Sequence, residues 1–137
     1  TDTTLTIPST SERVITVGAY DSVNISTVGF SGRGYTRATE YIKPDLVAPG
    51  VNILTTTVGG SITSFTGTSV AAPFVAGSVA LLMEWGIVDR NDIFLYGERL
   101  KAFLCNGAIR DNSREYPNRE WGYGRLCLKN TLDLLKK

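Results

Sequence analysis

The stretch that decides the fold is GTSVAAPFVAG, residues 67–77, because it joins a tight turn directly to an apolar helix. Gly67 and Thr68 are typical of a turn, whereas nearly every residue from 70 to 85 is apolar. A helix that is apolar on all its faces is typical of a buried core element. The sequence therefore predicts a buried helix over residues 70–85, with Ser69 at its cap or its first position.

Ser69 is the candidate nucleophile of this stretch. The first amides of a helix have no intrahelical acceptor, and the positive end of the helix dipole would face a developing anion. A serine nucleophile needs an exposed Oγ beside such donors. Pro73 is expected in the first turn, where a missing amide costs no helical bond. The alternative is a purely structural role, which spacing alone favours, in which Ser69 only caps the helix. An esterase elbow would require Gly-x-Ser-x-Gly, and Ala71 argues against it.

Short β-rich segments precede this helix and helical segments follow it. Segments 13–20 and 51–58 are rich in β-favouring residues and predict strands. Pro44 and Pro49 bracket a third short strand, predicted over residues 46–48. Gly59 and Gly60 indicate a turn, since no Gly-Lys-Ser/Thr follows to make a phosphate loop. A second helix is predicted from an Asn91 cap to about Cys105, and an amphipathic helix over residues 125–135. Strands followed by a central helix predict an α/β layered fold, with too few strands for a complete sheet.

Composition excludes several classes of protein. Lys and Arg number 14 against 13 Asp and Glu, a net charge of +1, so a nucleic-acid partner is not expected. Hydrophobic residues make up 42 % of the chain, enough for a packed core. The longest apolar stretch, residues 70–83, is shorter than the roughly 20 residues that cross a bilayer, so no membrane span is expected. The start at Thr1, without Met or a signal sequence, predicts the inner part of a longer protein.

The chain contains no His, so a Ser–His or Cys–His mechanism needs a base from elsewhere. Cys105 and Cys127 have no CxxC spacing, which argues against zinc, and two buried reduced thiols are favoured over a disulfide. No dense Asp or Asn cluster predicts a calcium site. We therefore expect no cofactor and no metal in this chain.

Other polar and aromatic residues have structural interpretations. Asp21 and Asp45 are possible acids, but Asp21 is expected to be solvated at the end of a strand and Asp45 to lie in a turn. The mixed charges of residues 110–120 indicate a solvated loop. Trp85 and Trp121 are expected to be packing residues.

Residues 67–77 resemble the nucleophile motif of the subtilisin-like serine proteases (subtilases, peptidase family S8), Gly-Thr-Ser-Met-Ala-Ala/Ser-Pro-His-Val-Ala-Gly. The departures are Val70 for Met and Phe74 for a His that is not the triad base; both are expected on the buried helix. Four further segments resemble family motifs in the family's order: RVITVGAYD (13–21), GFSGRGYT (29–36), KPDLVAPGVNI (43–53) and WGYGRLCL (121–128).

This resemblance implies the C-terminal half of a subtilisin-like three-layer α/β fold, with a mainly parallel sheet and a buried central helix starting at the nucleophile. It makes Ser69 the nucleophile and its amide one oxyanion donor, with Thr68 as a supporting hydroxyl. The family's triad Asp and His and its oxyanion Asn precede the matched region. Residues 1–137 are therefore expected to be an incomplete catalytic domain, inactive alone. The resemblance also implies a cis peptide bond before Pro8, beside the substrate pocket. Family members often bind calcium, but no site is expected here.

Residues 85–108 and 116–124 resemble clostridial subtilases, including the germination proteases of spores, which activate a cortex-lytic enzyme. This implies an extracellular or spore-associated protein whose partners are a protein or peptide substrate and its own upstream half. An open sheet edge and one uncovered helix face would drive self-association of the chain. The alternative function is a pseudoprotease, a regulatory binding module, because loss of the upstream His or Asp would leave Ser69 unchanged.

Overall fold

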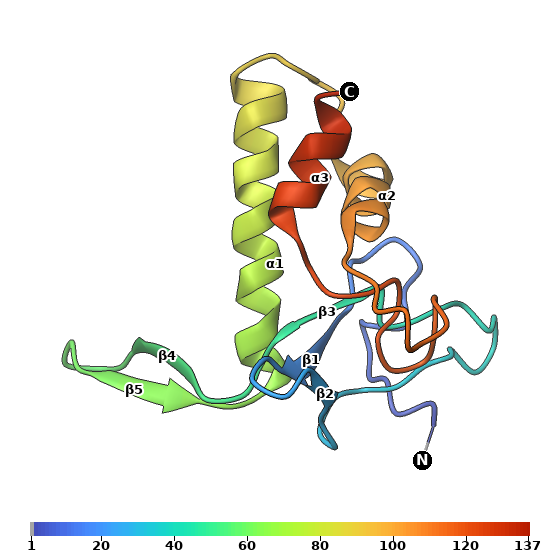
Figure 1. Ribbon diagram of the computed structural model, residues 1–137, viewed down its shortest axis with the longest axis vertical. Helices are drawn as coiled ribbons and strands as arrows, with labels where there is room; N and C mark the ends of the chain where they lie inside the picture. The colour runs from blue at the N-terminus through green and yellow to red at the C-terminus, as the bar shows by residue number, and fades with distance from the viewer. Residues whose placement is uncertain (1) are drawn as a thin grey trace.

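The computed structural model describes residues 2–137, which form an α/β arrangement with helices standing on one side of a small sheet (Figure 1). The elements follow in the order β1 (Val17–Asp21), β2 (Ser26–Thr27), β3 (Leu46–Pro49), β4 (Ile53–Thr56), β5 (Ile62–Phe65), α1 (Thr68–Met83), the π-helical turn η1 (Glu84–Val88), α2 (Gly97–Gly107) and α3 (Leu128–Leu135).

The central sheet has the strand order β2-β1-β3. β1 and β3 are parallel, with Val17 opposite Leu46, whereas β1 and β2 are antiparallel. The centre of β1 and residues 46–48 of β3 are buried, as expected for apolar strands covered on both faces. The expected α/β class is confirmed. The sheet of the described residues is mixed, with one parallel and one antiparallel pair.

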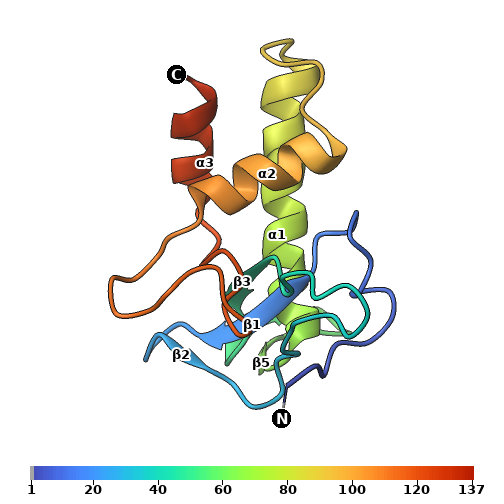
Figure 2. The same ribbon diagram turned by 90° about the vertical axis from the view of Figure 1, so that its right-hand side faces the viewer.

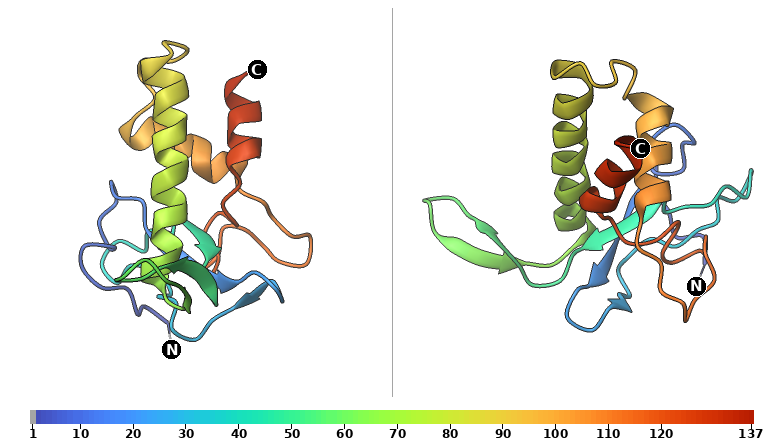
Figure 3. Two further views of the ribbon diagram at one scale, coloured as in Figure 1. Left: turned by 90° about the vertical axis from the view of Figure 1, so that its left-hand side faces the viewer. Right: turned by 45° about the horizontal axis from the view of Figure 1, so that its top comes forward.

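Helix α1 packs one face against β1 and β3. Its buried residues, Ala71, Val75, Ser78 and Leu82, recur at helical spacing and lie on this face. The opposite face carries exposed apolar side chains, and apart from the β4–β5 hairpin at the start of the helix no element of the described chain stands over it (Figure 3, left). The expected burial of this helix therefore holds for one face only.

The helical stretch is longer than the sequence indicates. η1 continues α1 without a break through Gly86, and the Asp89 amide bonds to the Glu84 carbonyl in the wider π pattern. Together they form 21 residues, Thr68–Val88, long and apolar enough to cross a membrane by length and composition. The length argument against a span was therefore wrong. Contact of the buried face with the sheet is typical of a core helix instead.

The two later helices also begin at different residues from those expected. α2 starts at Gly97, after Tyr96 in an extended conformation. Asn91 does not cap a helix, because its side-chain amide donates a hydrogen bond to the Trp85 carbonyl. α3 starts at Leu128, because residues 125 and 126 still pair with Ile109 and Val47. α3 packs on α2, which crosses between α1 and α3 (Figure 2).

Strands β4 and β5 form an antiparallel hairpin that projects from the foot of α1 (Figures 1 and 3). Gly59 and Gly60 make its turn, as predicted, with positive φ at both residues. β5 was not predicted from the sequence. All four residues of β5 are exposed, so its sequence lacks the alternation of apolar and polar residues that indicates a strand with one buried face.

Candidate active site

The start of α1 is tied to the carboxyl ends of β1 and β3. The Gly67 amide donates to the Gly50 carbonyl at 2.8 Å, and the Gly50 amide donates to the Tyr20 carbonyl at 3.0 Å. A Cβ on Gly50 would lie 2.6 Å from the Ala19 Cβ, so only glycine allows this approach. The backbone therefore holds the first turn of α1 at the edge where parallel strands end, which is where α/β proteins place their sites.

Ser69 is the second residue of α1 and is exposed. Its place within one residue of the helix start agrees with the prediction. The N-cap is Gly67, and no side chain makes a capping bond, so the capping interpretation of Ser69 is wrong. The amides of Val70 and Ala71 bond to the Gly67 carbonyl, while those of Thr68 and Ser69 find no backbone acceptor among residues 2–137. These two donors are free to face an anion beside Ser69 Oγ.

Pro73 does not lie in the first turn, as was expected, but in the second turn of α1. An amide at this position would have bonded to the Ser69 carbonyl in the i to i−4 pattern, so proline leaves that carbonyl without its helical partner. The helix nevertheless runs unbroken to Met83.

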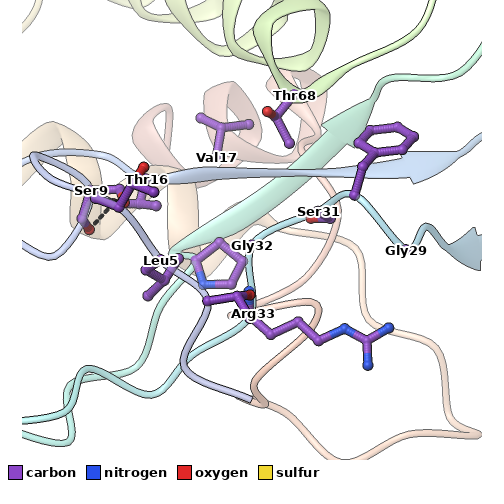
Figure 4. A pocket seen from close by; sticks show the side chains of 13 residues that line it. Leu5, Ser9, Thr16, Val17, Gly29, Ser31, Gly32, Arg33 and Thr68 are labelled. Carbon is purple, nitrogen blue, oxygen red and sulfur yellow. Dashed lines mark hydrogen bonds between the residues drawn. The ribbon is translucent and has the colours of Figure 1, made fainter. Parts of the chain in front are cut away.

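Thr68 faces a cavity of about 510 Å³ on the sheet side of the α1 start (Figure 4). Its walls come from the segment around Pro8, from β1 and from the loop before β3; the principal lining residues are Leu5, Thr6, Ser9, Thr16, Ser31 and Arg33. The Ile7–Pro8 peptide bond is cis, as predicted, and the residues on either side of it, Thr6 and Ser9, line this cavity. We call it the first pocket.

Ser69 itself faces a second cavity of about 510 Å³, between the β4–β5 hairpin and α1. Leu54 and Phe65 of the hairpin face Val70 and Phe74 of the helix across it. Val70 and Phe74 are the two departures from the family motif. They were expected on a buried helix, but both line this open groove beside Ser69. The candidate nucleophile thus lies between a pocket with many hydroxyl groups and an apolar groove.

Asp45 lies in the bend before β3, as expected, but it is also a deeply buried carboxylate with two cationic partners. Its oxygens lie 2.7 Å from Lys43 Nζ and 2.8 Å from Lys101 Nζ, and it accepts the Thr16 amide at 2.7 Å. Burial lowers the pKa of Lys43, against the opposing attraction of Asp45. Burial also acts on Lys101, but its bond and attraction to Asp45 outweigh it and raise the pKa. Both lysines are thus engaged with Asp45.

The charged segment 110–120 is not simply a solvated loop. Asp111 pairs with Arg114 at 2.6 Å and with Arg125 at 2.8 Å, and the Arg114 guanidinium lies 4.6 Å from the Trp121 ring centre. Trp121 is buried, as predicted. These contacts hold the segment against Arg125 and Trp121. The charges of mixed sign, which indicated a solvated loop, are therefore partly paired within the fold.

The remaining sequence candidates occupy structural positions. Asp21 is half-buried at the end of β1 and accepts the Val23 amide, as expected for a strand end. Both cysteines are free: Cys105 is buried, whereas Cys127 is half-buried rather than buried. Trp85 is partly buried against the core. No group of three potential metal-binding side chains gathers within residues 2–137.

Comparison with known proteins finds several proteases among the relatives of this chain. A profile of the subtilase family matches residues 1–124. The solved structure of the CspB protease of Clostridium perfringens superposes with a TM-score of 0.94 at 52 % identity, over 98 % of this chain and 29 % of that one. The patellamide maturation protease PatA gives a TM-score of 0.74 at 30 % identity, over 95 % of this chain and 46 % of that one. The serine protease AprX of Bacillus subtilis is 31 % identical, over 94 % of this chain and 32 % of its own length.

These matches support the clostridial resemblance of the sequence. They also show that the chain spans less than half the length of each of these three relatives.

Proposed function

Because this chain belongs to the subtilase family, we propose that it is the serine-bearing part of the catalytic domain of an endopeptidase that cleaves protein or peptide substrates. The observation that carries the proposal is the position of Ser69. It is exposed at the start of α1, between two cavities, beside two amides without a backbone acceptor in the described chain.

In the proposed reaction, Ser69 Oγ attacks the carbonyl carbon of the scissile peptide, and its proton passes to a His base. The Ser69 amide stabilises the oxyanion that forms, with the Thr68 hydroxyl close by as a supporting group. Collapse of the tetrahedral intermediate expels the amine, which takes the proton from His, and leaves an acyl-enzyme on Ser69. Water then hydrolyses the ester and restores the hydroxyl. The His and its Asp come from outside this chain, which contains no His.

We further propose that the partner supplying these groups is the upstream half of the same catalytic domain, seated on the uncovered face of α1. That face and the neighbouring groove expose large apolar side chains, among them Phe74, Leu81 and Phe65. Apolar surface of this kind is normally covered by another chain segment. Without that half, the same face would drive self-association of the chain.

The test is a chimera in which this chain replaces its matching segment in the CspB protease of Clostridium perfringens, to which it is 52 % identical. We expect the chimera to hydrolyse casein, and Ser69→Ala to abolish hydrolysis. Thr68→Val should lower kcat more than it changes KM, because a group near the oxyanion acts in the transition state. A folded chimera that binds casein peptides without cleaving them would favour the pseudoprotease alternative.

A finer proposal is that the protease acts at spore germination. It rests on the resemblance to clostridial germination proteases, and the proteolytic chimera would test it on the precursor of a cortex-lytic enzyme. Cleavage of casein but not of this precursor would reject the germination role while leaving the protease assignment intact.

A further inference from the structure

The buried cluster of Lys43, Asp45 and Lys101 has no part in the proposed chemistry, yet it is the most deeply buried group of charges in the described chain. Lys43 and Asp45 are 1 % and 2 % exposed. Lys101 comes from α2, far along the sequence, and its side chain is 18 % exposed. Burying three charges is unfavourable unless each is paired and hydrogen-bonded, so the contacts of the cluster indicate what it does.

Every hydrogen bond that the three side chains make outside the cluster is with residues 12–16. Lys101 Nζ donates to the Glu12 carbonyl at 2.6 Å and to the Val14 carbonyl at 3.1 Å. Lys43 Nζ donates to the same Val14 carbonyl at 2.9 Å, and Asp45 accepts the Thr16 amide at 2.7 Å. The cluster therefore replaces strand pairing for a segment that precedes β1 and has no strand partner of its own.

From this anchor, contacts lead directly into the first pocket. The Thr16 hydroxyl donates to the Ser9 carbonyl at 2.6 Å, and both residues line the pocket (Figure 4). At the other end of the wall, the Thr4 amide donates to the Arg33 carbonyl at 3.0 Å, and the Thr4 hydroxyl accepts the Arg33 amide at 2.9 Å. The bonds between Thr4 and Arg33 thus fix one end of the wall formed by residues 5–9. The buried cluster fixes the other end, through Thr16 and its bond to Ser9.

We propose that Lys101 is a positioning residue which, with Lys43 and Asp45, holds the wall of the first pocket in the conformation that receives the substrate. This proposal rests on the proposed function, because it takes the first pocket to be part of the substrate site. Among the three residues, Lys101 is the one that can be removed cleanly. Its loss leaves Lys43 and Asp45 as a neutral pair, whereas loss of Asp45 leaves two buried cations without a carboxylate.

The first experiment uses this chain alone and follows amide hydrogen exchange. In Lys101→Met, the hydrogen-bonded amides of residues 5–13, those of Ser9 and Ser11, should exchange about ten- to a hundredfold faster, because charged hydrogen bonds to two carbonyls are lost. Amides of α1 should be unchanged, and Lys101→Arg should restore most of the protection. The matched control is Arg99→Met, on the same helix, whose exposed side chain pairs with Asp92. Unchanged exchange in residues 5–13, or faster exchange throughout the chain, would overturn the proposal.

The second experiment measures peptide binding in the CspB chimera carrying Ser69→Ala, so that it needs no catalysis. Lys101→Met should raise the Kd of a casein-derived peptide about tenfold or more, with recovery in Lys101→Arg and no change in Arg99→Met. An unchanged Kd beside a loosened wall would reject the positioning role. Failure of the proposed function gives a different result: peptide binds and responds to Lys101→Met, but the chimera with Ser69 intact cleaves nothing.

Discussion

Replacing Asp45 with Asn tests whether the buried cluster is held together by one carboxylate. The wild-type cluster has two ammonium groups and one carboxylate, a net charge of +1. Asp45→Asn keeps the size of the side chain but leaves two cations side by side. Breaking a buried ion pair by removing one partner costs about 3–5 kcal/mol. Lys101→Met, which leaves a neutral pair, should cost about 1–2 kcal/mol for its lost hydrogen bonds.

The assay is equilibrium unfolding in urea, followed by the fluorescence of the buried Trp121 and by circular dichroism at low protein concentration. With a urea dependence of about 2 kcal/mol per M, the expected loss in Asp45→Asn lowers the unfolding midpoint by about 2 M. The matched control is Asp133→Asn, which breaks an exposed pair with Lys129 and should leave the midpoint unchanged. Coincident transitions from both signals are needed before free energies are compared.

The pH dependence of this variant has a definite sign. Without the carboxylate, burial lowers the pKa of Lys43 with nothing to oppose it, so the unfolded chain binds more protons than the folded one. The penalty of Asp45→Asn should therefore shrink as the pH rises from 7 towards 10. In the wild type, the pKa of Lys101 is raised by Asp45, so its contribution is present at neutral pH and is lost at pH values above its usual 10.5.

A double-mutant cycle gives the result that would refute this reasoning. Asp45→Asn with Lys101→Met removes the carboxylate together with one cation. The double variant should be less destabilised than the sum of the two single variants, by about 1–3 kcal/mol. Additive losses, or an Asp45→Asn midpoint within experimental error of the wild type, would mean that these charges do not act as a cluster.

Three further results are expected. Gly50→Ala places a Cβ 2.6 Å from a β1 side chain and should destabilise the chain by about 1–3 kcal/mol in urea unfolding. Gly77→Ala is the control, because a Cβ at this position on α1 meets open space and should not destabilise the chain. Equal effects of the two substitutions would contradict the account. Burial raises the pKa of Cys105 to about 11, so at pH 8 about one Cys105 thiol in a thousand is ionised. A thiol reagent should therefore modify Cys127 first. Faster modification of Cys105 than of Cys127, measured in single-cysteine variants, would show that burial does not protect Cys105. Phe74→Ser should reduce self-association in sedimentation experiments, because it removes an exposed apolar side chain from α1. A wild-type chain that stays monomeric at high concentration would show that the exposed apolar face of α1 does not drive association.

Local patterns in the sequence were sufficient to place the nucleophile and the strands beside it. The change from the Gly67 turn to an apolar run indicates where α1 begins, because turn chemistry and helix periodicity are both local properties. The buried segments of β1 and β3 follow from a short apolar run and from the prolines that bracket residues 46–48, which are also local properties. The cis bond at Pro8 was predicted only from the family resemblance, since residues around a proline do not by themselves select the cis isomer.

The errors arose where a partner distant in the sequence decides the outcome. The buried pairing of Asp45 was missed because its second cation, Lys101, comes from α2 and cannot be paired with it from spacing. Charges in segment 110–120 looked solvated because Asp111 gains Arg125 only when the chain folds back. In each case tertiary contacts overrode a correct local preference.

The central claim is that Ser69 is a nucleophile without a base in this chain, and labelling by a fluorophosphonate probe tests it most directly. The rate of Ser69 labelling is compared between the isolated chain and the CspB chimera, each with its Ser69→Ala control. The account predicts rapid labelling of the chimera and labelling slower by at least about 10⁴-fold in the isolated chain, since triad residues act as a unit, a magnitude known from subtilisin itself. Labelling of the isolated chain at the rate of the chimera would contradict the account, because it would show that a group within these 137 residues already activates Ser69.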